Sequence, residues 1–169
     1  HLENLIVLLK KINDKDVSEV RIDNYISNEL LNIFDDVLIE DPNQFLKILL
    51  DYILDTESVK KIIPRLGVNL RDFKEMSNRL ALESNIHQDI WIKEVFLQGF
   101  IISLTSNFER FDEIAVFLYL CEKPLKNILL KREISAENVN SLKLWIQNES
   151  VRTKYQNTFQ ERSALKPIN

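Results

Sequence analysis

The feature that most constrains this chain is an internal repeat with a period of 66 residues. Residues 62–80, IIPRLGVNLRDFKEMSNRL, align without a gap on residues 128–146, ILLKREISAENVNSLKLWI. The register extends upstream to residue 23 on residue 89, and ten of its positions are identical. Such a long period indicates a duplicated supersecondary unit. The identical pairs include Ile26/Ile92, Leu31/Leu97, Phe34/Phe100, Leu38/Leu104, Phe45/Phe111, Ile48/Ile114, Leu54/Leu120 and Ile62/Ile128.

Composition favours an all-α fold for this duplicated unit. The 169 residues are 45% hydrophobic and 28% charged, which is ordinary for a globular protein. They include only two glycines and four prolines. A β-sandwich or barrel needs special backbone angles at many corners, and so more of these residues. Each unit is about 60 residues, marginal for a core of its own, so we expect both to share one compact body.

Charge and cysteine content restrict which partners the chain can bind and which cellular compartment it can occupy. The net charge is −4 and no segment is strongly basic, which argues against nucleic acid as a partner. Cys121 is the single cysteine, so no intramolecular disulfide can form, and a reducing, cytoplasmic location is expected. No apolar run approaches the ~20 residues of a membrane span, and no signal peptide is visible. Without an initiator Met, the chain is interpreted as a piece of a longer protein.

Apolar periodicity predicts four helices in the first repeat. They run from residue 22 to 38, 45 to 54, 57 to 66 and 70 to 82, and the short second helix is apolar enough to be deep. Thr56 is predicted to cap the third helix and Asn69 the fourth. Gly67 supplies the left-handed residue that commonly closes a helix.

The second repeat follows the same plan. Its helices are predicted over 90–104, over 111–120, from Pro124 onward, and from a Ser135 cap to about residue 147. The helix at 90–104 is apolar nearly all round, which predicts a central position where the first helices of both repeats meet. Glu133 stands where the first repeat has Gly67, so this turn is expected to close differently.

The segments outside the repeats are assigned separately. An amphipathic helix is predicted over 2–12, in an additional segment 1–16. The first repeat is assigned to 22–84 and the second to 88–147. Residues 148–169 lose clear periodicity and are interpreted as a polar linker, helical at most at its start.

The duplicated unit resembles the Clp N-terminal domain, the double repeat that heads Clp-type AAA+ protein unfoldases. Residues 62–73, IIPRLGVNLRDF, are similar to that family's junction between its third and fourth helices, and residues 46–54 stand where the family has its apolar second helix. The resemblance covers about 22–147. It implies a pseudo-twofold body that recruits unfolded or tagged proteins, or adaptors, to an ATP-driven ring, which can work with a peptidase. Residues 148–169 would lead toward the ATPase domain.

The chain departs from the family at the start of the second helix. The family usually has Gly-Thr-Glu-His there, and the matching residues are 44–47, QFLK, and 110–113, RFDE. In some relatives the acidic residue of this motif helps to bind phosphoarginine. Asp112 could play that part and Leu46 could not, which argues against phosphoarginine recognition. Recruitment of substrates or adaptors remains the expected role.

Candidate binding residues are Phe45, Phe111, Asp112 and Glu113. The two phenylalanines occupy equivalent places in the repeats, and core packing is their simpler interpretation. If either is exposed, it would anchor an apolar segment of a substrate or adaptor, because aromatic residues dominate binding hot spots. Trp91 and Trp145 are assigned to the core.

No catalytic, metal or cofactor site is predicted. The glycines are isolated and no Lys-Ser/Thr follows either, so the chain has no phosphate loop, and ATP is expected only in the full-length protein. His87 is interpreted as a solvated turn residue, and no His or Cys cluster is spaced for a metal. Cys121 lies in an apolar run and is interpreted as a buried thiol.

The densest charge cluster consists of acidic residues. Asp35, Asp36, Glu40 and Asp41 are interpreted as the solvated face of a helix, with docking of a basic partner as the alternative. The leading functional hypothesis is a non-catalytic recognition domain of the Clp N-terminal type. The alternative is a helical scaffold for protein interactions without an attached ATPase.

Overall fold

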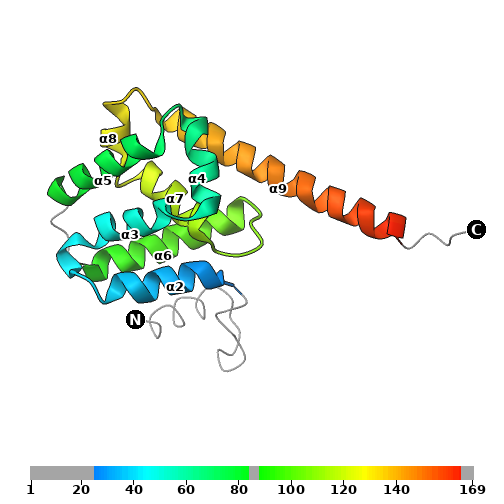
Figure 1. The fold of residues 1–169 in the computed structure, drawn as a ribbon, viewed down its shortest axis with the longest axis horizontal. Coiled ribbons are helices and arrows are strands. Elements are labelled where there is room, and N and C mark those ends of the chain that lie inside the picture. Colours follow the sequence, from blue (N-terminus) through cyan, green and yellow to red (C-terminus); the bar gives the residue numbers. More distant parts are fainter. Residues whose placement is uncertain (1–24, 84–87, 165–169) are drawn as a thin grey trace, which may run out of the picture.

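The structure, a computed structural model, is all-α over the residues it describes, 25–83 and 88–164 (Figure 1). The predicted helix at 2–12 lies outside this part of the chain. Two short 3₁₀ helices, η3 (Pro42–Gln44) and η4 (Ile63–Leu66), accompany the α-helices. The α-helices are α2 (Asn28–Leu38), α3 (Phe45–Leu54), α4 (Glu57–Ile62), α5 (Leu70–Glu83), α6 (Gln88–Thr105), α7 (Glu113–Glu122), α8 (Lys126–Leu130) and α9 (Ala136–Ala164).

Several helix starts follow from capping residues in the sequence. Ser27 caps α2 by accepting the Leu30 N–H at 3.2 Å, and Asn69 caps α5 as predicted, accepting the Asp72 N–H at 2.9 Å. Thr56 is the N-cap residue of α4, as predicted, but its side chain accepts no N–H of that helix. Its hydroxyl donates back to the Ile53 carbonyl oxygen at 2.7 Å, because Thr56 is buried against the end of α3.

The prediction for the turn at Glu133 is largely wrong. Glu133 adopts the left-handed conformation, with φ of 62°, and Gly67 has φ of 77°. The N–H of Glu133 donates to the Leu130 carbonyl oxygen at 3.0 Å, and that of Gly67 to the Pro64 carbonyl oxygen at the same distance. The turn between α8 and α9 therefore uses the same left-handed conformation and the same bond as the first, and it has one further bond, from the Ile134 N–H to the Leu129 carbonyl oxygen at 3.0 Å. The left-handed conformation costs about 1–2 kcal/mol here, because a side chain is forced into it.

Replacing Glu133 by glycine is expected to raise the free energy of unfolding by about 0.5–1 kcal/mol. Glycine relieves the strain, and its greater freedom in the unfolded chain offsets part of the gain. Thermal unfolding measures the change. Glu133→Ala is the matched control, because it removes the same carboxylate and keeps the Cβ atom. Equal stability of the glycine and alanine variants would show that the turn carries no strain.

The centre of the molecule is formed by α3 and α7. Six of the ten residues of α3 and eight of the ten of α7 are buried. The two helices pack on each other, α3 also on α2, α5 and α6, and α7 also on α4, α6 and α9. The prediction of a deep second helix at 45–54 is confirmed.

The predicted central position of α6 is wrong. Ile90, Ile101 and Leu104 of this helix are 57%, 41% and 58% exposed, although its other side is buried against α7. The first helices do meet, since the rings of Phe34 and Phe96 stack with centroids 4.5 Å apart. α6 carries more apolar surface than its neighbours can cover. The central positions are already taken by α3 and α7.

The segment before α2 is tied to the segment before α7. The Ser27 N–H donates to the Phe111 carbonyl oxygen at 2.9 Å, and the Phe111 N–H donates to the Tyr25 carbonyl oxygen at 2.7 Å. Ile26 and Phe111 thereby form an isolated parallel bridge. This contact joins residues more than 80 positions apart, and it brings the N-terminal ends of α2 and α7 together.

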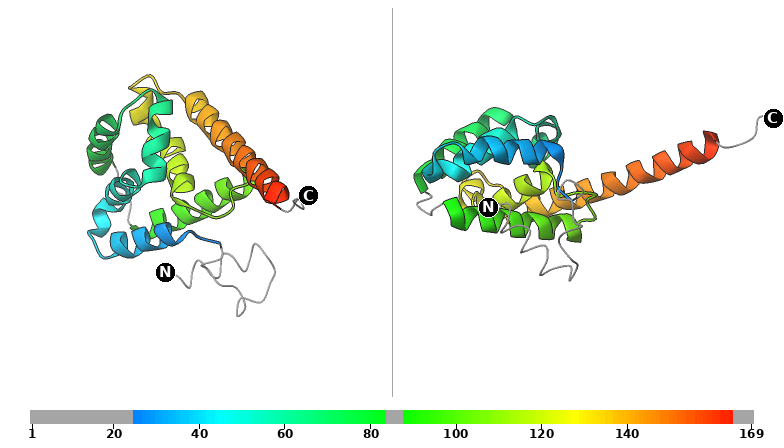
Figure 2. Two further views of the ribbon diagram at one scale, coloured as in Figure 1. Left: turned by 45° about the vertical axis from the view of Figure 1, so that its right-hand side comes forward. Right: turned by 90° about the horizontal axis from the view of Figure 1, so that it is seen from below.

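The last helix extends far beyond its predicted end near residue 147. α9 continues to Ala164 and projects away from the body (Figures 1 and 2). Residues 148–164 contain neither glycine nor proline, so nothing in the sequence stops the helix. The interpretation of this stretch as a linker helical only at its start is corrected. Over the described ranges, no helix has both the length and the apolar character needed to cross a membrane.

Candidate functional site

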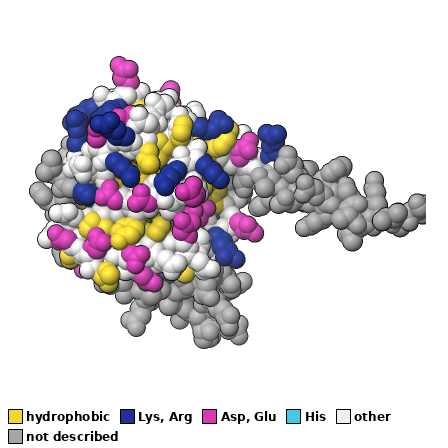
Figure 3. All heavy atoms as spheres, in the orientation of Figure 1, with side chains coloured by type: hydrophobic (Ala, Val, Ile, Leu, Met, Phe, Trp, Pro, Cys, Tyr) yellow, Lys and Arg dark blue, Asp and Glu magenta, His cyan; other side chains and the backbone are white. Residues whose placement is uncertain are grey.

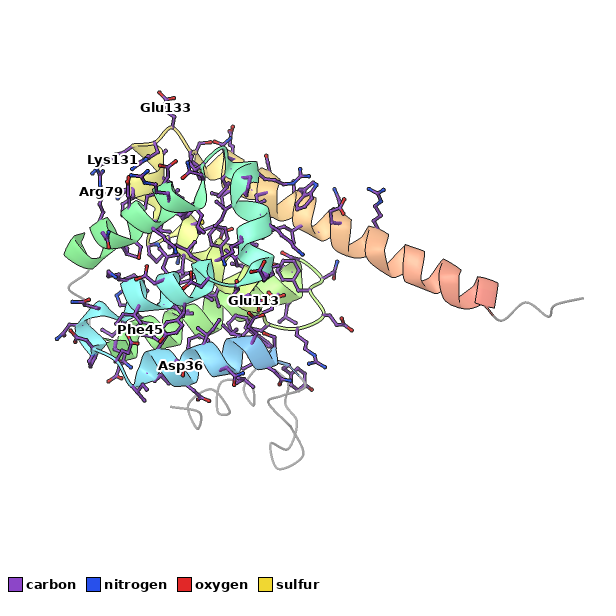
Figure 4. All side chains as sticks on the ribbon, in the orientation of Figure 1. Asp36, Phe45, Arg79, Glu113, Lys131 and Glu133 are labelled. Carbon is purple, nitrogen blue, oxygen red and sulfur yellow. The ribbon has the colours of Figure 1, made fainter. Side chains whose placement is uncertain are left out.

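A groove of about 620 Å³ opens where the N-terminal ends of α2 and α7 meet α4 and the middle of α9. Its walls mix carboxylates, hydroxyls and apolar side chains, and Figure 4 labels Glu113 in this region. The lining residues are Ser27, Glu29, Ser58, Lys61, Ile62, Phe108, Glu109, Arg110, Asp112, Glu113, Ile114, Trp145, Ile146 and Glu149.

Glu113 is the buried carboxylate of the groove. Its side chain is buried, the residue being only 7% exposed, and both carboxylate oxygens accept hydrogen bonds. The Ser58 hydroxyl donates to Oε1 at 2.6 Å and the Ser27 hydroxyl to Oε2 at 3.3 Å. Glu113 thus ties the start of α7 to α4 and α2. Both donors are neutral, so the negative charge of this buried group is not balanced by them.

Asp112 caps α7 beside Glu113. Its Oδ1 accepts the Ala115 N–H at 3.1 Å. Burial raises the pKa of Asp112 from 3.8 to about 6, the Ala115 N–H opposes that rise, and the neighbouring charge of Glu113 adds to it. Burial also raises the pKa of Glu29, and the charges of Glu113 and Glu57 raise it further. The carboxylates of the groove therefore repel one another.

Asp112→Asn is expected to raise the free energy of unfolding by about 1 kcal/mol at pH 7, because asparagine keeps the cap and removes the repelled charge. The folded-state pKa of Asp112 lies above its unfolded value, so the folded chain retains a proton that the unfolded chain loses between these values. The contribution of Asp112 to stability is thus present at low pH and lost as pH rises through about 6.

Thermal unfolding at about pH 5 and pH 7.5 checks this expectation, since the gain from Asp112→Asn should be larger at the higher pH. Asp112→Ala is the control. It removes the cap acceptor together with the charge, and the lost cap costs about 1 kcal/mol. A gain from Asp112→Asn that does not depend on pH would mean that Asp112 carries no raised pKa.

The structure separates the four predicted binding residues. Asp112 and Glu113 line the groove, whereas Phe45 and Phe111 are 3% and 1% exposed and belong to the core. The condition under which either ring would anchor a partner, exposure to solvent, is not met. Phe45 lies at the start of α3 (Figure 4) and does not line the groove. Phe111 is buried between the lining residues Arg110 and Asp112, and its backbone forms the bridge to Ile26.

The sequence did not reveal that Ser27 and Ser58 bind Glu113, or that Trp145 lines the groove. Ser27 and Ser58 reach Glu113 from 86 and 55 positions away, a convergence that no local pattern signals. Trp145 packs against the core, as predicted, but is only half-buried and lines the groove. The Arg65 guanidinium lies over its ring, 3.5 Å from the centroid.

The described part of the chain offers no catalytic constellation. No group of three or more His, Cys, Asp or Glu side chains there could hold a metal ion, and neither histidine falls within the described ranges. Cys121 is buried, and burial raises the pKa of its thiol strongly, so it is not a ready nucleophile. The groove hydroxyls of Ser27 and Ser58 donate to the Glu113 carboxylate, and no histidine lies among the described residues to accept their protons.

The predicted acidic cluster lies on another face. Asp35, Asp36, Glu40 and Asp41 are exposed at the end of α2 and just beyond it, and acidic side chains are spread over this side of the molecule (Figure 3). A second depression of about 600 Å³ begins there, between Glu40 and Asp55. Its acidic groups are partly paired. The Lys47 ammonium lies 2.7 Å from the Asp51 carboxylate, Lys74 lies 3.4 Å from Asp55, and the Tyr52 hydroxyl donates to Glu40 at 3.0 Å.

Comparison of the chain with family models, with curated proteins and with solved structures finds no match.

Proposed function

We propose that this chain is a non-catalytic recognition domain built on a duplicated four-helix unit of the Clp N-terminal type. Its role would be to recruit unfolded or tagged proteins, or adaptors, to an ATP-driven unfolding ring in the cytoplasm. ATP and any peptidase ring would belong to the full-length protein. α9 would be the connection toward the ATPase domain, since it leaves the body as a single projecting helix (Figure 1).

The observation that carries this proposal is the repetition of local geometry at the 66-residue spacing. Asn69 caps α5 and Ser135, 66 residues later, accepts the Asn138 N–H at 3.4 Å at the start of α9. The left-handed turn residues, Gly67 and Glu133, are also 66 residues apart, and so are the carbonyl oxygens that they bond. The turn contacts are made by the backbone at positions whose residues differ, so they support a duplicated unit independently of the identical residues.

Burial follows the same spacing and supports the same unit. The helices succeed one another in matching order, α2 to α5 and then α6 to α9. Equivalent apolar positions are buried in both halves. The pairs are Phe34/Phe100, Phe45/Phe111, Leu54/Leu120, Val59/Leu125, Ile62/Ile128, Phe73/Val139, Met76/Leu142 and Leu80/Ile146.

The groove at Glu113 is where recruitment would take place. It is open, it combines apolar and charged walls, and its volume lies in the range of ligand sites. Binding there would be weak and transient. Tethering a weakly bound substrate beside the pore raises its local concentration, so high affinity is not required.

A helical scaffold without an ATPase is the second candidate. It is favoured by the departure at the starts of α3 and α7, where residues 44–47 and 110–113 replace the family's usual motif. Extending the coding sequence past residue 169 distinguishes the two candidates. A Gly-rich phosphate loop there fits the unfoldase, and its absence from the complete gene leaves the scaffold.

Binding of unfolded polypeptide to the purified chain tests the recognition role. A labelled, reduced and alkylated protein that cannot refold serves as the probe, and its native form serves as the matched control. We expect saturable binding of the unfolded form in the micromolar to millimolar range, measured by fluorescence anisotropy. Equal affinity for the two forms, or no binding of either, would contradict a role in recruiting unfolded proteins.

A further inference from the structure

We propose that the groove at Glu113 selects a polypeptide segment carrying a lysine or arginine next to an apolar residue. The cationic group would lie between Glu29, Asp112 and Glu113, with the apolar side chain against the wall formed by Phe108 and Trp145. This inference rests on the proposed function, that the chain recognises polypeptide. It adds the chemical class of segment that the groove accepts.

The balance of charge in the groove is the first argument. Its lining includes five carboxylates and only two cationic side chains, Lys61 and Arg110. Within the described ranges, no ion pair within 4.0 Å involves Glu29, Glu109, Asp112 or Glu113.

Elsewhere on the described surface, several carboxylates form ion pairs with lysine or arginine. Arg132 lies 3.6 Å from Asp72 and 3.3 Å from Glu75, and Lys143 lies 3.3 Å from Glu122. Within the described ranges, carboxylates without an ion pair also lie at the exposed end of α2, at Asp35 and Asp36. The groove differs in that it brings four such carboxylates into one concave site where α2, α4, α7 and α9 meet. A positively charged ligand group would balance them, and phosphates or acidic peptides would be repelled.

The position of Glu113 is the second argument. Its carboxylate is buried and accepts hydrogen bonds from the hydroxyls of Ser27 and Ser58. A charge with little water around it attracts an incoming cation more strongly than a charge on the open surface does. The geometry is also fixed in advance, because both oxygens are already oriented by their donors, so little ordering is lost when the ligand binds.

The apolar wall is the third argument. Phe108, Ile114 and Trp145 are half-buried and line the same groove. Lysine and arginine carry an apolar stem behind the charged group, and such a wall suits the stem together with a neighbouring side chain. The Arg65 guanidinium stacked on Trp145 shows that this ring already accepts a cation within the chain.

The carboxylates at the start of α7 have no counterpart at the start of α3. The residues 66 positions before Asp112 and Glu113 are Leu46 and Lys47. Leu46 is 1% exposed, and the Lys47 ammonium is 2.7 Å from the Asp51 carboxylate. The equivalent positions in the first half are therefore not carboxylates. The depression beside them is lined by Glu40, Asp41, Asp51 and Asp55, but Lys47 and Lys74 already pair with Asp51 and Asp55.

Fluorescence anisotropy with three labelled peptides tests the inference. Each peptide contains the same apolar residues around a central position that is arginine, glutamine or glutamate. We expect the arginine peptide to bind at least tenfold more tightly than the glutamine peptide, as for a hydrogen-bonded charge pair, and the glutamate peptide more weakly still. Added salt should weaken binding of the arginine peptide alone.

Three groove variants locate the site. Glu113→Gln, Asp112→Asn and Glu29→Gln should each weaken the arginine peptide severalfold and leave the glutamine peptide unchanged. Glu137→Gln, an exposed carboxylate on α9 away from the groove lining, is the matched control and should have no effect. Asp112→Asn is expected to be more stable than the natural chain, so its loss of binding cannot be attributed to unfolding.

The outcomes separate this inference from the proposed function. Equal affinity for the arginine and glutamine peptides, or loss of binding in Glu137→Gln but not in the groove variants, overturns the inference. If the unfolded protein still binds in those cases, the recognition role survives without cationic selection. If neither the unfolded protein nor any peptide binds, both fail.

Discussion

Replacing Phe111 by alanine is expected to lower the free energy of unfolding by about 3–5 kcal/mol. The ring is 1% exposed and meets two other aromatic rings edge-on. Its centroid lies 5.9 Å from that of Phe96 and 6.4 Å from that of Phe100. Truncation would remove these contacts and leave a cavity under α6, beside the backbone bridge to Ile26.

Urea unfolding followed by circular dichroism measures the loss for Phe111→Ala. Phe108→Ala is the matched control, because Phe108 lies in the same connection but is half-buried. Its truncation should cost much less, about 1 kcal/mol, as the ring gives up only part of its buried area. Similar losses for the two variants would contradict the assignment of Phe111 to the core and reopen its role as an anchor for partners.

The second large effect is expected at Gly99, on the buried side of α6. A Cβ atom at this position would lie 2.5 Å from Cε2 and 2.7 Å from Cζ of Phe111. In an exposed helix, alanine would be about 1 kcal/mol better than glycine. Here we expect Gly99→Ala to destabilise the chain by about 1–3 kcal/mol, because the helix and the ring must move apart.

A double-mutant cycle distinguishes this clash from a general effect of the substitution. Phe111→Leu removes the ring that the new methyl group would meet, so Gly99→Ala should cost less in the Phe111→Leu background than in the natural chain. The same urea experiment provides the four free energies of unfolding. Additive costs would show that Gly99 is not required for the approach of α6 to Phe111.

The candidate site shows how local preference and site geometry can conflict. Asp112 is a good cap for α7, yet it lies beside a second buried carboxylate, and burial raises its pKa to about 6. A chain optimised for stability alone would place asparagine there. Residues that lower stability in this way are typical of functional sites, where binding requires groups that the fold by itself does not favour.

Elements whose signals are local can be predicted from the amino-acid sequence. α3 begins and ends where its apolar run does, at Phe45 and Leu54, and α5 starts at its Asn69 cap. Gly67 closes its turn in the left-handed conformation. Each of these depends on residues within a few positions of one another, and capping, apolar periodicity and backbone freedom are properties of such short stretches.

The central position among the apolar helices and the location of the groove depend instead on how the helices pack together. α6 is apolar all round yet partly exposed, because burial depends on how much surface its neighbours can cover. Glu133 accepts a strained conformation because the packed helices on both sides fix the turn. Glu113 meets Ser27 and Ser58 only after the two halves of the chain have packed together. Contacts of this kind are set by the shape of the assembled core, which no short stretch of sequence specifies.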